Sequence, residues 1–237
     1  MKTARIAAIV GASLGLAAGA SAQNLSEGFD NIGALPGQGW AFRNNSDSPA
    51  NGYFQGNTSV FAAHSGPANS YLGANFESTG APVGTISNWA MTPARTYQNG
   101  DAISFYTRTV SQPFFPDRLE VRLSTNGAST DVGMTSTSVG DFTTLLLTIN
   151  PVLSLAGYPT DWMQFQINIS GLGGPVVGRL AFRYFVTFAG FAGTNSDYIG
   201  IDSLDIRGQS QIIPLPTAGA MGLAGFGFIA TRRRRAG

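Results

Sequence analysis

The sequence predicts an all-β protein built from two antiparallel sheets that pack face to face as a jelly-roll sandwich. Two observations predict this fold. Apolar and polar residues alternate with a period of two in several segments, so that each segment would place its apolar side chains on one face of a strand. No segment in the middle of the chain has helical periodicity, and Gly, Ser, Thr and Asn are abundant there, which is typical of polar turns between short strands.

The predicted strands have one apolar and one polar face, as expected for two packed antiparallel sheets. Residues 143–149 differ because they are almost continuously aliphatic and β-branched, which predicts a strand buried on both faces. We expect about ten strands. The sequence has no internal repeat of fixed period, which argues against a solenoid or a propeller. The alternating segments are residues 102–107, 118–124, 164–170, 179–186 and 198–206.

Residues 1–22 have the three parts of a secretory signal peptide. Two cations in the first five residues are followed by an uncharged apolar run of 14 residues, and then by Ala20 and Ala22 in a small-x-small pattern. A helix that spans a bilayer needs about 20 residues, so this run is too short for a retained anchor. We therefore expect signal peptidase to cleave before Gln23 and the chain to be exported.

Residues 212–237 have a second three-part pattern, in which Pro214 and Pro216 precede an uncharged segment expected to form an apolar helix. Four arginines follow, and they are expected to stay cytoplasmic because they cross a membrane only at high cost. This order of parts resembles the PEP-CTERM sorting signal of Gram-negative bacteria, although Leu215 stands where that motif has Glu. The resemblance implies an at least transient membrane contact and a C-terminal sorting enzyme, which would either remove or retain the tail. The arginines are Arg232, Arg233, Arg234 and Arg235.

The segment between these signals, residues 23–211, is long enough for one domain with a substantial core. It contains eight arginines, no lysine and thirteen carboxylates, which give a net charge of −5. An acidic domain without a basic stripe argues against nucleic acid as a partner. The chain has no cysteine, so disulfides and thiol chemistry are excluded.

Six motifs of this segment, in their order along the chain, resemble the choice-of-anchor J domain, which is related to the cleaved-adhesin and MAM-like jelly rolls. The resemblance implies a surface or secreted domain that is followed by one of several kinds of anchor and has no established enzymatic role. The motifs occupy residues 26–30, 86–93, 103–108, 117–124, 179–186 and 195–202.

Candidate catalytic groups are few. His64 is the only histidine, it lies in a Gly/Ala/Ser/Pro-rich segment, and no Gly-x-Ser-x-Gly elbow accompanies it, so we expect it on a surface loop. Glu120 has the mid-strand position that a jelly-roll glycosidase would use for one carboxylate of a pair. Because Arg118 and Arg122 flank it on the same face, we expect instead a solvated row of alternating charges. The sequence predicts no enzyme and no catalytic residue.

Calcium is the cofactor for which the sequence offers ligands. Glu27 and Asp30 begin the domain and Asp197 and Asp202 end it, and the first and last strands of a jelly roll often lie side by side. Carboxylates on loops suit a hard cation, so these four residues are a candidate calcium site. The related jelly rolls imply a structural cation at positions matching Asp30 and Asp202. The alternative is that Asp202 hydrogen-bonds the backbone and the others are merely exposed.

The aromatic residues divide into two groups. Trp40, Trp89 and Trp162 are expected to pack in the interior, with sugar stacking as the alternative. Phe114 and Phe115 are adjacent in a Pro-bounded loop, which predicts either a plug over the open end of the sandwich or an exposed contact patch.

Together these features predict an exported, surface-anchored or secreted, non-catalytic protein of a Gram-negative type bacterium, with a structural, adhesive or matrix-associated role. Its expected location is the cell envelope, the outer surface or the extracellular space. The alternative function is a carbohydrate-binding module or carbohydrate-active enzyme on the same fold. The expected partners are signal peptidase, the sorting enzyme, the membrane, and an extracellular polysaccharide or protein.

Cell fractionation with intact-mass measurement tests the predicted processing. We expect the protein in the envelope or medium to have the mass of a chain that begins at Gln23, because the small residues before Gln23 are those that signal peptidase accepts. A mass that includes Met1 in the envelope fraction would contradict this prediction. The same mass shows whether residues 212–237 are removed.

Overall fold

The computed structural model describes residues 24–209. The predicted signal peptide with its cleavage positions Ala20, Ala22 and Gln23 lies outside these residues, as does the predicted sorting segment of residues 212–237. In the described part of the chain, no helix is long and apolar enough to cross a membrane.

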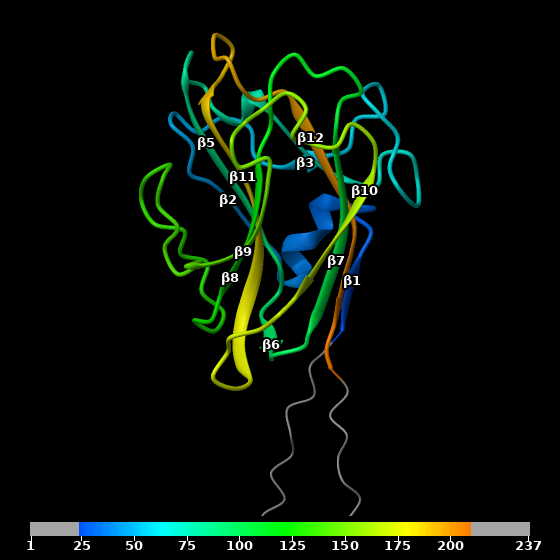
Figure 1. Ribbon diagram of the computed structural model, residues 1–237, viewed down its shortest axis with the longest axis vertical. Coiled ribbons are helices and arrows are strands. Elements are labelled where there is room, and N and C mark those ends of the chain that lie inside the picture. Colours follow the sequence, from blue (N-terminus) through cyan, green and yellow to red (C-terminus); the bar gives the residue numbers. More distant parts are fainter. Residues whose placement is uncertain (1–23, 210–237) are drawn as a thin grey trace, which may run out of the picture.

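The described chain forms a sandwich of two six-stranded antiparallel sheets, which confirms the predicted fold class (Figure 1). In sheet A the strand order is β10-β7-β12-β4-β3, and β1 also pairs with β12. The strands of sheet A are β1 (Leu25–Glu27), β3 (Phe54–Gln55), β4 (Leu72–Asn75), β7 (Ala102–Thr109), β10 (Met163–Asn168) and β12 (Tyr198–Arg207).

In sheet B the strand order is β2-β5-β11-β8-β9, and β6 also pairs with β11. The strands of sheet B are β2 (Ala41–Asn44), β5 (Gly84–Met91), β6 (Arg95–Tyr97), β8 (Leu119–Ser124), β9 (Thr144–Ile149) and β11 (Val176–Ala189). Each of the five alternating segments predicted from the sequence coincides with a strand of these two sheets, although 118–124 begins one residue before β8 and 164–170 ends two residues after β10.

The core lies between the sheets and follows from the alternation in the sequence. Ile103 and Phe105 of β7 point inward from sheet A, and Phe182 of β11 meets them from sheet B. The rings of Phe105 and Phe182 are 5.0 Å apart in an edge-to-face arrangement. The 3₁₀ helix η1 (Ile32–Gln38) contacts β2 of one sheet and β3 of the other, and its Ile32 and Leu35 add to the core. A second short 3₁₀ turn, η2 (Phe76–Ser78), follows β4.

The prediction for residues 143–149 is right about the strand but wrong about its burial. These residues form β9, which lies at the edge of sheet B beyond β8. Leu145 is about half exposed there, because an edge strand is covered on one side only. A continuous aliphatic run therefore does not distinguish a central strand from an edge strand in this chain.

The prediction that Glu120 belongs to a solvated row of charges is wrong. Glu120 and Arg183 are both buried on the outer face of sheet B, under the loop of residues 125–143. Val132 and Phe142 of that loop pack against Trp89 of β5 and close this face. The sequence did not reveal that this loop covers the sheet. A strand with alternating charges has the same sequence pattern whether its polar face is exposed to solvent or covered by a loop.

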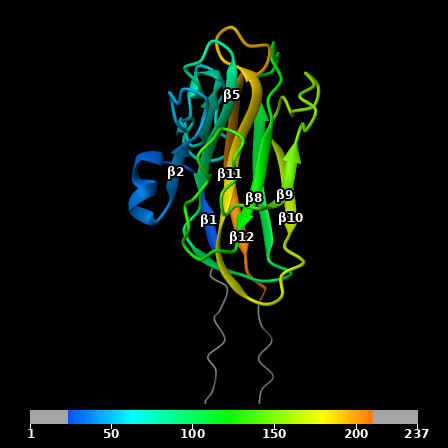
Figure 2. The same ribbon diagram turned by 90° about the vertical axis from the view of Figure 1, so that its left-hand side faces the viewer.

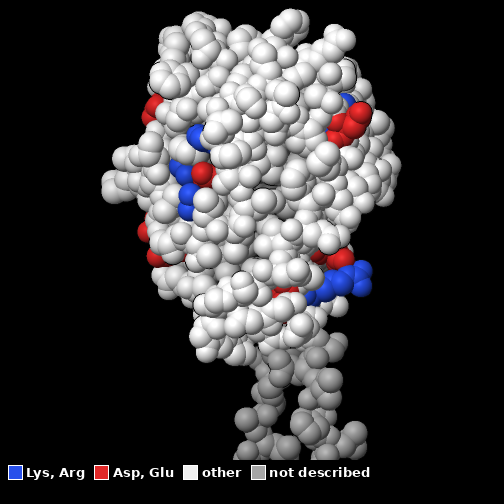
Figure 3. Space-filling model, viewed as in Figure 1, with Lys and Arg blue, Asp and Glu red and all other residues white. Residues whose placement is uncertain are grey.

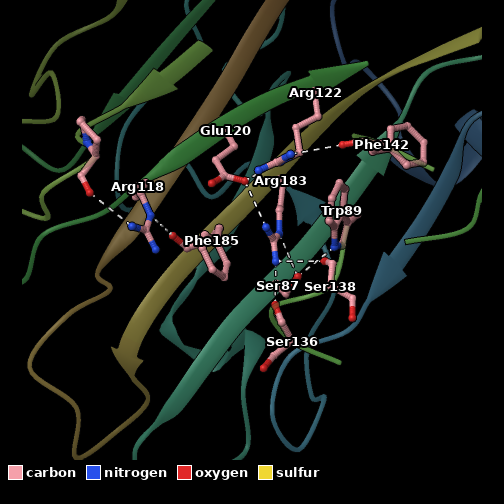
Figure 4. Close-up of polar contacts among 11 residues, drawn as sticks. Ser87, Trp89, Arg118, Glu120, Arg122, Ser136, Ser138, Phe142, Arg183 and Phe185 are labelled. Carbon is pink, nitrogen blue, oxygen red and sulfur yellow. Dashed lines mark hydrogen bonds and ion pairs between the residues drawn. The ribbon is translucent and has the colours of Figure 1, made fainter. Parts of the chain in front are cut away.

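The guanidinium of Arg183 connects the loop to the sheet (Figure 4). It donates hydrogen bonds to Glu120 at 3.1 Å, to Ser87 Oγ at 3.0 Å and to the backbone carbonyls of Ser136 and Ser138 at 2.7 and 3.3 Å. Burial lowers the pKa of Arg183 to about 10, while Glu120 opposes this shift. Buried charges are tolerated where they are paired and hydrogen-bonded, and this arrangement meets both conditions.

The first and last described segments lie side by side. β1 pairs with the end of β12, and Gly208 N–H donates to Asn24 Oδ1 at 3.0 Å. Figures 1 and 2 show both described ends at the bottom of an elongated domain. The opposite end of the molecule, at the top of Figure 1, is therefore the part farthest from both ends of the described chain.

Replacing Arg183 with Met tests the role of the buried ion pair. We expect the free energy of unfolding to fall by about 3 kcal/mol, because Glu120 loses a partner and two loop carbonyls lose their donor. Urea unfolding of the exported protein measures this. Arg207 is the matched control, because its pair with Asp205 is exposed and Arg207→Met should cost less than about 0.5 kcal/mol. Equal losses in the two variants would contradict the assigned role.

Candidate functional site

The candidate site lies at the distal end, opposite the two ends of the described chain. Three loops meet there: residues 76–83 after β4, residues 110–118 after β7, and residues 190–197 between β11 and β12, which is gold in Figure 1. The strand β12 runs from this end to the other and has ten residues, so the two ends lie roughly 30 Å apart.

Hydrogen bonds between backbone groups hold the three loops in one arrangement. Ser196 N–H donates to Pro116 C=O at 2.9 Å, and Phe76 N–H donates to Asp197 C=O at 3.1 Å. Gly190 has a φ of 106°, and a Cβ atom there would lie 2.4 Å from the carbonyl oxygen of Ala81. Only glycine fits this position, so the close contact between the two loops requires glycine at residue 190.

Five exposed phenylalanine side chains form the distal patch. Four lie on these loops, and Phe188 lies at the end of β11, which leads into the third loop; the five are Phe76, Phe114, Phe115, Phe188 and Phe191. Phe114 is 82% exposed and Phe191 72% exposed. With about 200 Å² per ring, the exposed fractions of the five rings give about 600 Å² of apolar surface, which is at the upper end of the range for the largest patches on monomeric proteins. The upper end of the face in Figure 3 is largely free of charged atoms.

The Phe pocket, of about 280 Å³, lies within this patch. Four of the five rings line it, together with the carboxylate of Asp197, which is half-buried. Asp197 accepts hydrogen bonds from the backbone N–H groups of Phe114 and Phe115, which fix the carboxylate against the loop. Burial raises the pKa of Asp197.

A second carboxylate, that of Asp117, lies directly behind Asp197. It is fully buried and accepts hydrogen bonds from Tyr184 Oη at 2.5 Å, from Thr109 Oγ1 at 2.8 Å and from the Asp197 N–H at 2.9 Å. Burial raises the pKa of Asp117 to about 6, although these hydrogen bonds oppose the shift. The network connects the distal loops to the core through Tyr184 of β11.

A second, amide-lined pocket has a volume of about 540 Å³, and its residues Glu77 and Tyr198 directly follow Phe76 and Asp197 of the Phe pocket in the chain. Its wall combines side-chain amides, one carboxylate and aromatic rings, a combination that suits the hydroxyl groups of a sugar. Asn51 and Asn75 both donate to Glu77 Oε2, at 3.2 and 3.3 Å. The lining side chains include Asn51, Phe54, Gln55, Asn57, Asn75, Glu77 and Tyr198.

The structure does not bring the four predicted calcium ligands together. Asp202 hydrogen-bonds the backbone N–H of Ser65 at 3.1 Å, which is the alternative foreseen for it. Asp197 lies five residues earlier, roughly 17 Å along an extended strand, and Glu27 accepts from the N–H of Phe29. No group of three or more Asp, Glu or His side chains among the described residues could hold a metal ion. Calcium binding by Glu27, Asp30 or Asp202 stays a prediction.

His64 is exposed on a loop, as predicted. Its ring stacks on Tyr106 with 3.5 Å between ring centroids, and its Nδ1 lies 3.0 Å from Ser203 Oγ. The neighbouring Asp202 carboxylate accepts from backbone N–H groups. These three side chains are close, but the contacts are not those of a Ser-His-Asp triad, in which the carboxylate orients the imidazole ring.

All three tryptophans pack against other side chains, but only Trp40 lies in the core between the sheets. Trp40 and Trp89 are buried. Trp162 is half-buried against Phe61 and Tyr71 and donates to the Ala62 carbonyl at 2.9 Å. Trp89 belongs to the smaller cluster beneath the loop of residues 125–143, outside the core between the sheets.

The sequence identified Phe114 and Phe115 but left two alternatives open, and the structure shows both side chains exposed. Phe76, Phe188 and Phe191 were not predicted to join them. Phe191 lies in a Gly-rich turn directly after β11, which ends one residue beyond Phe188, and an aromatic residue in such a turn was the available signal. The amide-lined pocket had no such signal, because its residues come from separate loops.

No protein-family model and no curated protein matches the chain. Among solved structures, the K1 cleaved adhesin domain of Lys-gingipain from Porphyromonas gingivalis W83 is similar, with a TM-score of 0.55 and 22% identity over 79% of this chain and 99% of that domain. The fold is similar to that of cleaved adhesin domains. The K2 domain of Lys-gingipain has a TM-score of 0.52 and 17% identity over 78% of this chain and all of that domain. At these identities the similarity establishes the β-sandwich fold alone.

The pKa of Asp117 predicts how stability depends on pH. Its pKa in the folded protein, about 6, lies above the ordinary 3.8, so its stabilising contribution is complete below 3.8 and is lost as pH rises through about 6. Relative to Asp117→Asn, which does not titrate, the wild type should lose up to about 3 kcal/mol of stability between about pH 4 and pH 7. Chemical unfolding of both proteins across this range measures the difference. A difference that does not change with pH would contradict the assignment.

Proposed function

We propose that this chain is an exported, non-catalytic surface domain that mediates adhesion through its distal patch. In this proposal the signal peptide directs export, and residues 212–237 hold or sort the protein at the envelope of a Gram-negative type bacterium. Signal peptidase and a C-terminal sorting enzyme are its processing partners. The domain is a choice-of-anchor J domain, and its tail is a variant of the PEP-CTERM signal.

One observation carries the adhesive role: the exposed phenylalanines lie at the end opposite the attachment of both tails. Asn24 and Gly208 are hydrogen-bonded to each other at one end, while the rings of Phe114 and Phe191 are exposed at the other. A domain tethered at its C-terminus would therefore present the patch away from the membrane. The backbone hydrogen bonds between the loops also reduce the entropy that is lost on binding.

The absence of catalysis is part of the proposal, and two arrangements support it. Glu120, the strongest carboxylate candidate in the sequence, is buried and paired with Arg122 and Arg183. His64 is not oriented by a carboxylate in its contact with Ser203. Neither residue has the geometry of a general acid or base at an open cleft.

The second candidate function is carbohydrate binding, and the amide-lined pocket is the observation that favours it. Sugar sites combine amide and carboxylate hydrogen-bonding groups with aromatic faces, and this pocket has Asn51, Glu77 and Phe54 in one wall. Glu77 and Tyr198 of this pocket directly follow Phe76 and Asp197 of the Phe pocket in the chain, so a glycan held there would lie toward the same end of the molecule.

Attachment of cells that carry the full chain tests the first function and separates it from the second. We expect the double variant Phe114→Ser/Phe191→Ser to reduce attachment to the level of cells that lack the protein, because the patch loses its two most exposed rings and about half of its exposed apolar area. Met134→Ser is the matched control, since Met134 is 95% exposed on the loop over sheet B.

The same strains are assayed for retention of the exported protein on a polysaccharide array, together with Asn51→Ala. Normal attachment by the double variant would contradict adhesion through the patch. Retention on a glycan that depends on Asn51 but not on Phe114 would establish the second function instead.

A further inference from the structure

The Phe pocket contains a group that an apolar contact surface does not need. The carboxylate of Asp197 lies among four phenylalanine rings and is held there by two backbone N–H groups. None of the ion pairs formed within residues 24–209 includes Asp197. The pocket therefore combines aromatic walls with a negative charge that no cationic side chain in the described chain neutralises.

This combination decides which kind of group can occupy the pocket. An apolar group would remove water from the Asp197 carboxylate without supplying a counter-charge, which is strongly unfavourable. An anionic group would be repelled by Asp197 and by the Asp117 carboxylate behind it, to which the Asp197 N–H donates at 2.9 Å. A cation gains from both carboxylates and from the negative faces of the rings.

The surroundings of the pocket favour a macromolecular source for that cation. The pocket of about 280 Å³ has room for the aliphatic stem and charged end of a Lys or Arg side chain. Phe114, Phe188 and Phe191 extend the apolar surface beyond it. A small amine would leave this surface in water, whereas a protein that inserts one basic side chain would cover it.

We propose that the Phe pocket binds a basic side chain, Lys or Arg, of a partner polypeptide, with Asp197 as its counter-charge. This inference rests on the proposed adhesive function and specifies the chemistry of the partner. Asp197 forms the ion pair, and the rings of Phe114 and Phe191 enclose the stem of the side chain. The surrounding patch contacts apolar residues of the partner next to its basic residue.

Titration of the exported protein with capped tripeptides tests the inference. Gly-Lys-Gly and Gly-Arg-Gly are compared with Gly-norleucine-Gly, which has a similar stem without the charge, and the backbone amides of Phe114 and Phe191 are followed by NMR. We expect both basic peptides to bind at least about tenfold more tightly than the norleucine peptide, and their affinity to fall as salt is added.

Two variants identify the group responsible. Asp197→Asn keeps the carbonyl oxygen that accepts from the Phe114 N–H but removes the charge, and it should weaken the basic peptides at least about tenfold. Asp131→Asn is the matched control, because Asp131 is exposed on the loop over sheet B and also accepts from a backbone N–H group, that of Gly133, and it should change affinity less than about twofold. An unchanged thermal unfolding midpoint shows that each variant remains folded.

Equal binding of the norleucine peptide, or full affinity in Asp197→Asn, would overturn the inference. Cell attachment distinguishes this failure from failure of the proposed function. If Asp197→Asn cells attach normally while Phe114→Ser/Phe191→Ser cells do not, the patch is adhesive but the pocket takes no cation. If the phenylalanine variant also attaches normally, the adhesive function itself is wrong.

Discussion

The buried ion pair between Arg183 and Glu120 determines which surfaces of this sandwich remain open. The guanidinium of Arg183 lies between the rings of Trp89 and Phe185, 4.8 and 3.7 Å from their centroids, and fills its hydrogen-bonding positions with Glu120 and the loop above. The loop carbonyls that accept from Arg183 hold residues 125–143 over the part of the outer face of sheet B that surrounds Trp89 and Glu120. That part of the face is not available for a partner.

The outer face of sheet A is partly covered for a different reason. Gly200 of β12 leaves room where a Cβ atom would lie 2.8 to 3.0 Å from the rings of Phe61, Trp162 and Tyr71. These rings pack over the strand as a separate aromatic cluster, and Tyr198 joins them through its hydroxyl contact with Tyr71 at 3.0 Å. With both faces covered to this extent, the loops of the distal end carry the largest exposed aromatic surface.

The sequence predicted the fold well because strand alternation is a local property. Residues 118–124 and 179–186 place Val121 and Phe182 in the core as their periodicity requires. Burial of the polar faces was not predictable, because Glu120 is covered by a loop whose path depends on tertiary contacts. The positions of the four candidate calcium ligands also depend on tertiary structure, which is why the sequence wrongly placed all four in one site. Their order along the chain placed Asp197 near Asp202, but β12 is extended and carries Asp197 to the distal end.

The candidate site was predictable only in part. Phe114 and Phe115 are adjacent in the sequence and could be identified there, whereas Phe76 and Phe191 come from other loops and join them only in the folded structure. What joins these loops is polar: Asp117 accepts from the Asp197 N–H and from Tyr184 of the core strand β11. The distal loops are thereby attached to the most buried part of sheet B.

This connection would also make the proposed binding of a cation at Asp197 sensitive to the charge of the core. The negative charge of Asp197 contributes to raising the pKa of Asp117, after the larger effect of burial. A cation placed at Asp197 would cancel that contribution and favour the ionised form of Asp117. Because linkage is reciprocal, ionisation of Asp117 must in turn strengthen binding of the cation. Ionised Asp117 lowers the stability of the fold above about pH 6, and the same negative charge lies behind the pocket and favours a bound cation. Loss of one proton from Asp117 would therefore lower the stability of the core and raise the affinity of the Phe pocket for a cation.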